Sequence, residues 1–169
     1  MVGPMGEQPY PFSAAGGGDA DQVLMLYQSV TGGAFCTWNE YYPGMQQIRE
    51  DYESNNLFAL KSGENIIGAI SIVPENELDD LELWEMKDGK IAEVARVAVA
   101  PEYQGQGLAL RMVTEIEKVL ENRGYRAVHL LAALSNIPAC HTYRKAGYQL
   151  LGECDMYGHR FCAFEKKLD

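Results

Sequence analysis

Long apolar runs are missing from this sequence. No stretch of about 18 apolar residues occurs, so we expect no membrane-spanning helix and no membrane partner. The N-terminus lacks the basic-then-apolar pattern of a secretory signal, so none is expected. The four cysteines (Cys36, Cys140, Cys154 and Cys162) form no Cys-x-x-Cys pair, and the histidines show no metal-ligand spacing. These absences suit reduced thiols in a cytoplasmic protein and predict no metal site.

Positive charge is also scarce. The 14 basic residues face 24 acidic ones, which gives a net charge of −10. Nucleic acid is therefore not expected as a ligand, because phosphate backbones require basic patches. Much of the acidic excess lies in Pro74–Lys90, at Glu75, Glu77, Asp79, Asp80, Glu82, Glu85 and Asp88. This segment is either a solvated hairpin loop or an acidic rim that attracts a cationic amine.

Two nucleotide-binding motifs are absent as well. The sequence has neither a G-x-G-x-x-G turn after the strand predicted at 91–100 nor a Gly-Lys-Ser/Thr phosphate loop. What it has is a β-branched stretch over 91–100, then Pro101, which has no N–H to continue a sheet ladder. Gly105 and Gly107 follow and permit positive φ, and from Leu108 apolar residues recur at helical spacing.

A strand, a glycine turn and a helix in this order place free backbone N–H groups at a helix start. Such groups suit a phosphate or a pyrophosphate, although the pattern alone also describes a tight turn. The turn reads Gln104-Gly105-Gln106-Gly107-Leu108-Ala109, which fits Gln/Arg-x-x-Gly-x-Gly/Ala. It resembles the pyrophosphate-binding loop of the GNAT superfamily of acetyl-CoA-dependent N-acetyltransferases, with Ala109 where glycine is commoner.

A second motif follows one predicted strand later. Residues 127–134 are typical of a buried strand, and a short helix with Pro138 in its first turn and Gly147 at its end comes next. The residues that match the second GNAT signature, Asn-x-x-Ala-x-x-x-Tyr-x-Lys-x-Gly-Phe/Tyr, are Asn136, Ala139, Tyr143, Lys145, Gly147 and Tyr148. Two signatures in the expected order are far more specific than either one.

The resemblance implies a mixed α/β fold. We expect a central, mostly antiparallel twisted sheet flanked by helices, with a splayed strand pair that holds coenzyme A. We expect an irregular segment over 1–18, rich in glycine and proline, and a single GNAT domain over 19–169. Helices are expected over 20–30, capped by Asp19, and over 38–54 with a break near Pro43-Gly44.

The resemblance also implies the residues that hold acetyl-CoA, a co-substrate. The loop amides are expected to hold the pyrophosphate, and the backbone of the preceding strand is expected to pair with the pantetheine amides. Asn136 is expected to bond the pantetheine arm, with plain helix capping as its alternative role. The candidate cofactor-binding residues are Val97, Ala98, Val99, Gln104, Gly105, Gln106, Gly107, Leu108, Ala109, Asn136, Ala139 and Tyr143.

Two candidate catalytic residues carry the chemistry. Glu93 is the candidate base that accepts the amine proton. If the strand has no bulge, Glu93 shares one face with Ala95, Val97 and Val99. Arg96 then lies on the other face, where we expect it to pair with an acidic neighbour. Alternatively, Glu93 is a carboxylate at the end of the strand that faces solvent, or one that only orients the substrate. Tyr143 is the candidate acid for the leaving thiolate, because a phenol stays protonated at neutral pH; its alternative is a core aromatic.

These residues predict transfer of an acetyl group to a primary amine by direct attack in a ternary complex. The alternative is an acyl-CoA sensor of the same fold without catalysis, and another acyl group such as succinyl also stays open. The acceptor is an amine on a small molecule, a peptide or a protein, and Trp38, Tyr41 and Tyr42 are candidates for its pocket. Many members of the resembled family form dimers, which makes a homodimer a further expectation.

Overall fold

The computed structural model describes residues 10–74 and 81–169, which form a seven-stranded sheet in the order β1-β2-β3-β4-β5-β7-β6. Only β4 and β5 pair in parallel; the other neighbours are antiparallel. This confirms the expected mixed, mostly antiparallel sheet. The strands are β1 (Phe12–Ala14), β2 (Leu57–Ser62), β3 (Asn65–Val73), β4 (Ile91–Val99), β5 (Ala127–Ala133), β6 (Gln149–Met156) and β7 (His159–Lys167).

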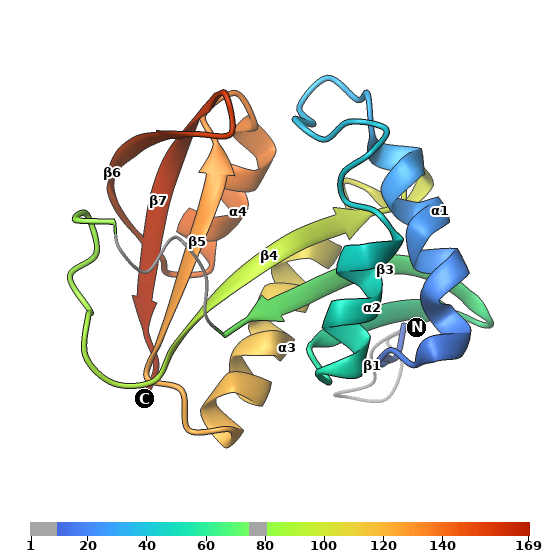
Figure 1. Cartoon of the computed structure of the whole chain (residues 1–169), viewed down its shortest axis with the longest axis horizontal. Coiled ribbons are helices and arrows are strands. Elements are labelled where there is room, and N and C mark those ends of the chain that lie inside the picture. Colours follow the sequence, from blue (N-terminus) through green and yellow to red (C-terminus); the bar gives the residue numbers. More distant parts are fainter. Residues whose placement is uncertain (1–9, 75–80) are drawn as a thin grey trace, which may run out of the picture.

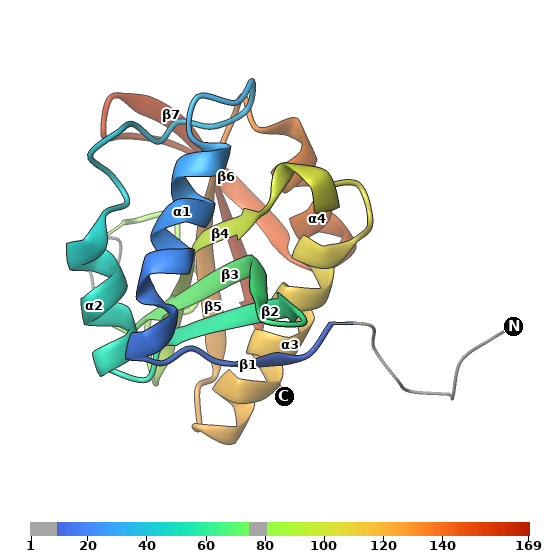
Figure 2. The ribbon, with the colours of Figure 1, turned by 90° about the vertical axis from the view of Figure 1, so that its right-hand side faces the viewer.

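Helices cover both faces of the sheet. On one face lie α1 (Ala20–Val30) and α2 (Met45–Glu53), and on the other lie α3 (Leu108–Asn122) and α4 (Ile137–Lys145), as Figures 1 and 2 show. Apolar residues of α3 recur every turn and bury one stripe against β3, β4 and β5, with Met112 and Ile116 fully buried. A second core, around Val23 and Ile48, lies under α1 and α2.

The N-terminal part of the chain differs from the expectation of an irregular segment. Residues 1–9 lie outside the described residues, but Phe12–Ala14 form β1 against β2, because Phe12 stacks on Phe58 at 5.6 Å between ring centroids. Asp19 stands at the start of α1 without capping it by its side chain. Its carboxylate instead accepts the Gly16 N–H at 3.0 Å and pairs with Lys61 at 3.1 Å.

The expected helix over 38–54 begins only at Met45. Residues 38–44 run as an irregular segment that holds an isolated bridge between Asn39 and Tyr42. Pro43 explains the late start, because a proline disfavours helical backbone in the residue before it and has no N–H to donate.

The acidic segment is only partly described, since Glu75, Glu77, Asp79 and Asp80 lie outside the described residues. The described part, 81–90, is not a solvated hairpin. Trp84 is buried and stacks on His129 with ring centroids 3.8 Å apart. The N–H of Met86 donates to Glu165 at 2.9 Å, and the same carboxylate contacts His129 at 2.8 Å. This segment therefore covers the face of β5 and β7 that α1 and α2 leave open.

Candidate functional site

The site begins where β4 and β5 part. The two strands pair only from Ile91 opposite Ala127 to Glu93 opposite His129, after which β5 continues against β7 alone. Figure 1 shows the two arrows diverging from a common start. Backbone groups of β4 beyond Glu93 that face β5 have no strand partner, although buried N–H and C=O groups require one. A pocket of about 660 Å³ opens along this edge, a size typical of ligand sites.

A bulge in β4 changes which side chains face the pocket. Ser71 pairs with Ala95 but Ala69 pairs with Ala98, so β4 carries one extra residue, and Arg96 has a φ of +51°. Beyond the bulge, Val97 and Val99 pack on the α3 side of the sheet.

The expectation that Glu93 shares one face with Ala95, Val97 and Val99 is therefore wrong beyond Ala95. The extra residue reverses the alternation of side chains. For the same reason, Arg96 projects toward α2, on the same side as Glu93 and Ala95.

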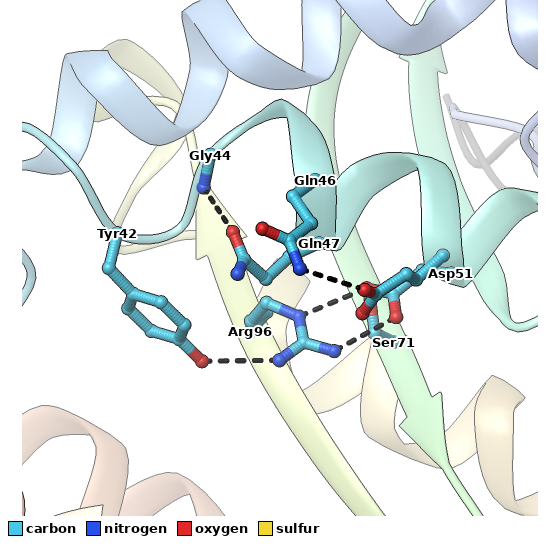
Figure 3. Close-up of polar contacts among 8 residues, drawn as sticks. Tyr42, Gly44, Gln46, Gln47, Asp51, Ser71 and Arg96 are labelled. Atoms are coloured by element: carbon cyan, nitrogen blue, oxygen red, sulfur yellow. Dashed lines mark hydrogen bonds and ion pairs between the residues drawn. The ribbon is translucent and has the colours of Figure 1, made fainter.

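The Arg96 guanidinium is held by an ion pair with the buried Asp51. Nε and Nη2 of Arg96 donate to the two carboxylate oxygens of Asp51 at 3.0 and 2.9 Å (Figure 3). Ser71 donates its hydroxyl to Asp51 at 2.7 Å, and Nη1 of Arg96 donates to the hydroxyl of Tyr42 at 3.1 Å. The expected pairing of Arg96 with an acidic neighbour is confirmed.

Burial alone would lower the pKa of Arg96. The hydrogen bonds and the charge of Asp51 outweigh that effect, and the pKa of Arg96 is raised above its ordinary value. Arg96 therefore stays charged wherever the protein is folded.

The glycine turn closes one end of the pocket. Gly105 and Gly107 have φ values of +81° and +77°, and no side chain caps the start of α3. The first amides of a helix have no intrahelical acceptor, so this helix start offers free N–H groups to an anion. Gln104 does not reach over the turn; its Nε2 donates to the carbonyl of Val99 at 2.9 Å and fixes the turn to the end of β4.

On the opposite wall, α4 presents Asn136 and Tyr143. The Oδ1 of Asn136 accepts the N–H of Ala139 at 3.2 Å, so the capping role is present, while its Nδ2 can still donate. Tyr143 lines the pocket and is 7% exposed. Burial raises the pKa of Tyr143 above its ordinary value, with a smaller contribution from Cys140, so its phenol keeps its proton at neutral pH.

Cys140 is the thiol closest in sequence to Tyr143, yet it is poorly suited to act as a nucleophile. Its Sγ donates to the carbonyl of Ala133 at 3.7 Å. Burial and the neighbouring Cys162 raise the pKa of Cys140 to about 11. Since the thiolate is the reactive form, this cysteine is almost entirely unreactive at neutral pH.

The structure brings most of the predicted site residues together. Of the candidate cofactor-binding residues, all but Gln106 line the pocket. Gln106 instead borders a separate hollow beside Tyr10 and Arg111. Glu93 is not among the described lining residues. It lies where β4 and β5 are still paired, just before the two strands separate.

Other lining residues came from segments with no readable pattern. Trp38 lines the pocket, whereas Tyr41 is 81% exposed and Tyr42 reaches the site only through Arg96. Phe35 and Phe161 also line it and were not predicted. The segment 31–44 has no periodicity, so only its cluster of aromatic residues hinted at a pocket.

The profile of the Acetyltransferase (GNAT) family matches residues 23–148. The chain belongs to this family.

Structural and sequence relatives agree with this assignment. A GNAT acetyltransferase from Streptococcus agalactiae superposes with a TM-score of 0.78 at 20% identity, over 96% of this chain and 97% of that one. The structure of yncA from Salmonella typhimurium, solved with its cofactor acetyl-CoA, gives 0.75 at 14% identity, over 96% and 95%.

Curated relatives match over shorter stretches. Mycothiol acetyltransferase from Arthrobacter sp. is 38% identical over 68 residues, 40% of this chain and 21% of that protein. N-acetyltransferase 8B from Rattus norvegicus is 24% identical over 124 residues, 69% of this chain and 53% of that protein. The chain thus spans about a fifth of the length of the mycothiol acetyltransferase and about half of the length of N-acetyltransferase 8B.

The described ranges hold neither a cluster of metal ligands nor a helix suited to span a membrane. Within 10–74 and 81–169, no three His, Cys, Asp or Glu side chains gather as metal ligands. In the same part of the chain, no helix has the length and apolar character that crossing a membrane requires.

The buried ion pair makes a first prediction. Replacing Asp51 with alanine leaves Arg96 charged and unpaired inside the protein, so Asp51→Ala lowers the free energy of unfolding by about 3 kcal/mol. Urea denaturation measures this loss. Asp155→Ala is the matched control, because its ion pair with Arg160 is exposed and contributes nothing measurable. Equal stability of the two variants would contradict a structural role for Asp51.

Proposed function

We propose that this protein transfers an acetyl group from acetyl-CoA to a primary amine by direct attack within a ternary complex. One observation supports this above the others: the unpaired edge of β4 is followed, across the turn at 100–107, by the uncapped start of α3. An edge that needs hydrogen-bond partners and a set of free amides that suits phosphate lie end to end. A long ligand with amides at one end and a pyrophosphate at the other fits this combination.

The residues present fit coenzyme A. A Cβ built on Gly105 or Gly107 meets no atom within 4 Å, so the space above the turn is open for a pyrophosphate. In this proposal, the turn amides hold the pyrophosphate and the backbone of Val97 and Val99 pairs with the pantetheine amides. The Nδ2 of Asn136 donates to the same arm. The acetyl-CoA-bound yncA structure has this fold, which supports the assignment.

Acetyl-CoA supplies an activated thioester. The protein positions the two reactants and stabilises the charges that develop during the transfer. In this proposal, a backbone N–H of β4 beside the bulge stabilises negative charge on the thioester oxygen. Tyr143, which stays protonated, donates a proton to the departing sulfur. The unreactive thiol of Cys140 favours direct attack by the amine over transfer through a cysteine.

Glu93 remains our candidate base. Because Glu93 lies just before the point where β4 and β5 separate, and not among the residues that line the pocket, it would accept the amine proton through water. The amine needs this help, since an amine of pKa ~10.4 is neutral in only about one molecule in a few thousand at pH 7.

We further propose a cytoplasmic location. All four cysteines, Cys36, Cys140, Cys154 and Cys162, are free thiols, which suits a reducing compartment.

The turn makes a prediction about the donor. Alanine at position 107 would have to keep a φ of +77°, which costs roughly 1–2 kcal/mol, so Gly107→Ala weakens coenzyme A binding about tenfold. Calorimetry measures the dissociation constant. Gly124→Ala is the matched control: it has a φ of +85° at the far end of α3 and leaves the affinity unchanged. Equal weakening in both variants would trace the effect to general strain.

The acid makes a third prediction. Tyr143→Phe removes the proton donor and keeps the ring, so kcat falls about 100-fold while the KM for acetyl-CoA changes little. Steady-state assays with an amine panel measure this. Because the pKa of Tyr143 is raised, its ionisation causes no loss of wild-type rate below about pH 10. Tyr148→Phe, a neighbouring buried ring outside the pocket, should keep its rate. An undiminished kcat in Tyr143→Phe would remove the acid role.

The base makes a fourth prediction, which depends on pH. Glu93→Gln lowers kcat/KM at about pH 6, and the loss shrinks toward about pH 9, because more of the amine is then already neutral. A pH profile of the two enzymes measures the ratio. A loss that stays constant across this range would indicate a carboxylate that only orients the substrate.

A further inference from the structure

The described lining of the acceptor half contains no acidic side chain, in contrast to the acidic composition of the whole chain. We define this half by its lining residues Val30, Phe35, Thr37, Trp38, Arg96 and Phe161. None of the described residues that line the pocket is acidic, and the charged ones are Arg96 and Lys145. Lys145 lies on α4, with the proposed donor site. Among the described residues, the charged side chain that lines the acceptor half is therefore Arg96, which is ion-paired with Asp51.

Arg96 has donors left over. A guanidinium carries five N–H groups, of which two bond Asp51 and one bonds Tyr42 (Figure 3). The remaining two, on Nη1 and Nη2, have no acceptor among the described residues. Only 13% of the Arg96 side chain is exposed. Partly buried donors require an acceptor, and two neighbouring guanidinium nitrogens match the two oxygens of a carboxylate.

The surroundings make Arg96 suitable for recognition. Asp51 holds the guanidinium on two nitrogens, so little rotational freedom is lost when a ligand binds. Arg96 also directly precedes Val97 on the pantetheine-binding edge. Arg96 and Val97 both line the pocket, so a carboxylate bound by Arg96 lies in the same cavity as the pantetheine-binding edge. An amine one carbon away from that carboxylate can reach it.

The rest of the acceptor half is apolar. Phe35, Trp38 and Phe161 are aromatic, and the Trp38 ring packs edge-on against the buried Tyr27 at 5.3 Å. Such walls accept an apolar side chain. A polyamine or a lysine side chain would meet Arg96 without any compensating carboxylate from the described wall.

We propose that the acceptor is an α-amino acid with an apolar side chain, bound through its carboxylate by Arg96. The identity of the amine as the acetylated group rests on the proposed function; the carboxylate site does not. The proposal separates a free amino acid from an amine at a protein N-terminus or on a lysine, because neither of those has a carboxylate beside its amine.

Binding to the coenzyme A-saturated protein tests the site without catalysis. Calorimetry compares three matched ligands: phenylalanine, phenethylamine, which lacks the carboxylate, and 3-phenylpropionate, which lacks the amine. Leucine and isopentylamine form a second pair with a smaller side chain. We expect each carboxylate to bind about 100-fold more tightly than its matched amine. Equal or tighter binding of the amines, or no binding of any carboxylate, would overturn the proposal.

Acetylation of the same pairs separates this inference from the proposed function. We expect kcat/KM for phenylalanine to exceed that for phenethylamine about 100-fold. Carboxylate binding with no acetylation would overturn the proposed function and keep the site. Acetylation without preference for the carboxylate, or a preference for peptide N-termini, would keep the function and overturn this inference.

Two variants separate recognition from folding. Arg96→Lys keeps the charge but loses the paired donors, and it should lower the phenylalanine-to-phenethylamine ratio of kcat/KM about tenfold or more. Tyr42→Phe keeps the ion pair with Asp51 and should lower the same ratio by a smaller factor. A merely structural role of Arg96 would depress both substrates equally and leave the ratio unchanged, which would count against the proposal.

Discussion

The ion pair of Arg96 with Asp51 holds the one irregular point of β4. A non-glycine residue in a left-handed conformation is strained by roughly 1–3 kcal/mol, and such a residue persists only where its surroundings fix it. Here, two hydrogen bonds to a buried carboxylate fix it, and Ser71 and Tyr42 complete the arrangement. The bulge at Arg96 sends Val97 and Val99 to the α3 side of the sheet. The pocket wall thus depends on a contact made from α2.

The parting of β4 from β5 gives the fold its long binding edge. Parallel pairing stops after three residues, and β5 continues against β7 alone. Helix α3 then starts after the turn at 100–107, and no side chain caps its first amides. These two features belong to the backbone, so they do not depend on one side chain. The acceptor half of the site is formed instead by side chains, namely Arg96 and three aromatic rings.

The parts of the site that could be read from the sequence are local. Gly105 and Gly107 adopt a positive φ, and Asn136 caps its helix. Each of these features can be recognised from the few residues around it. The faces of Val97 and Val99 relative to Glu93 could not be predicted, because one extra residue in β4 reverses the alternation and no local sequence pattern reveals it. Phe161 enters the pocket through the register of β7. Trp84 packs on His129 across 45 residues of chain, which no local pattern reveals.

The open edge of β4 also links ligand concentration to the stability of the fold. A ligand that pairs with this edge binds the folded state alone, because the unfolded chain has no edge. At a concentration one hundred times its dissociation constant, such a ligand adds about 2.7 kcal/mol to the free energy of unfolding. The folded fraction of this protein would then rise and fall with the supply of its donor, and a shortage would expose the chain to proteolysis before it slowed any reaction.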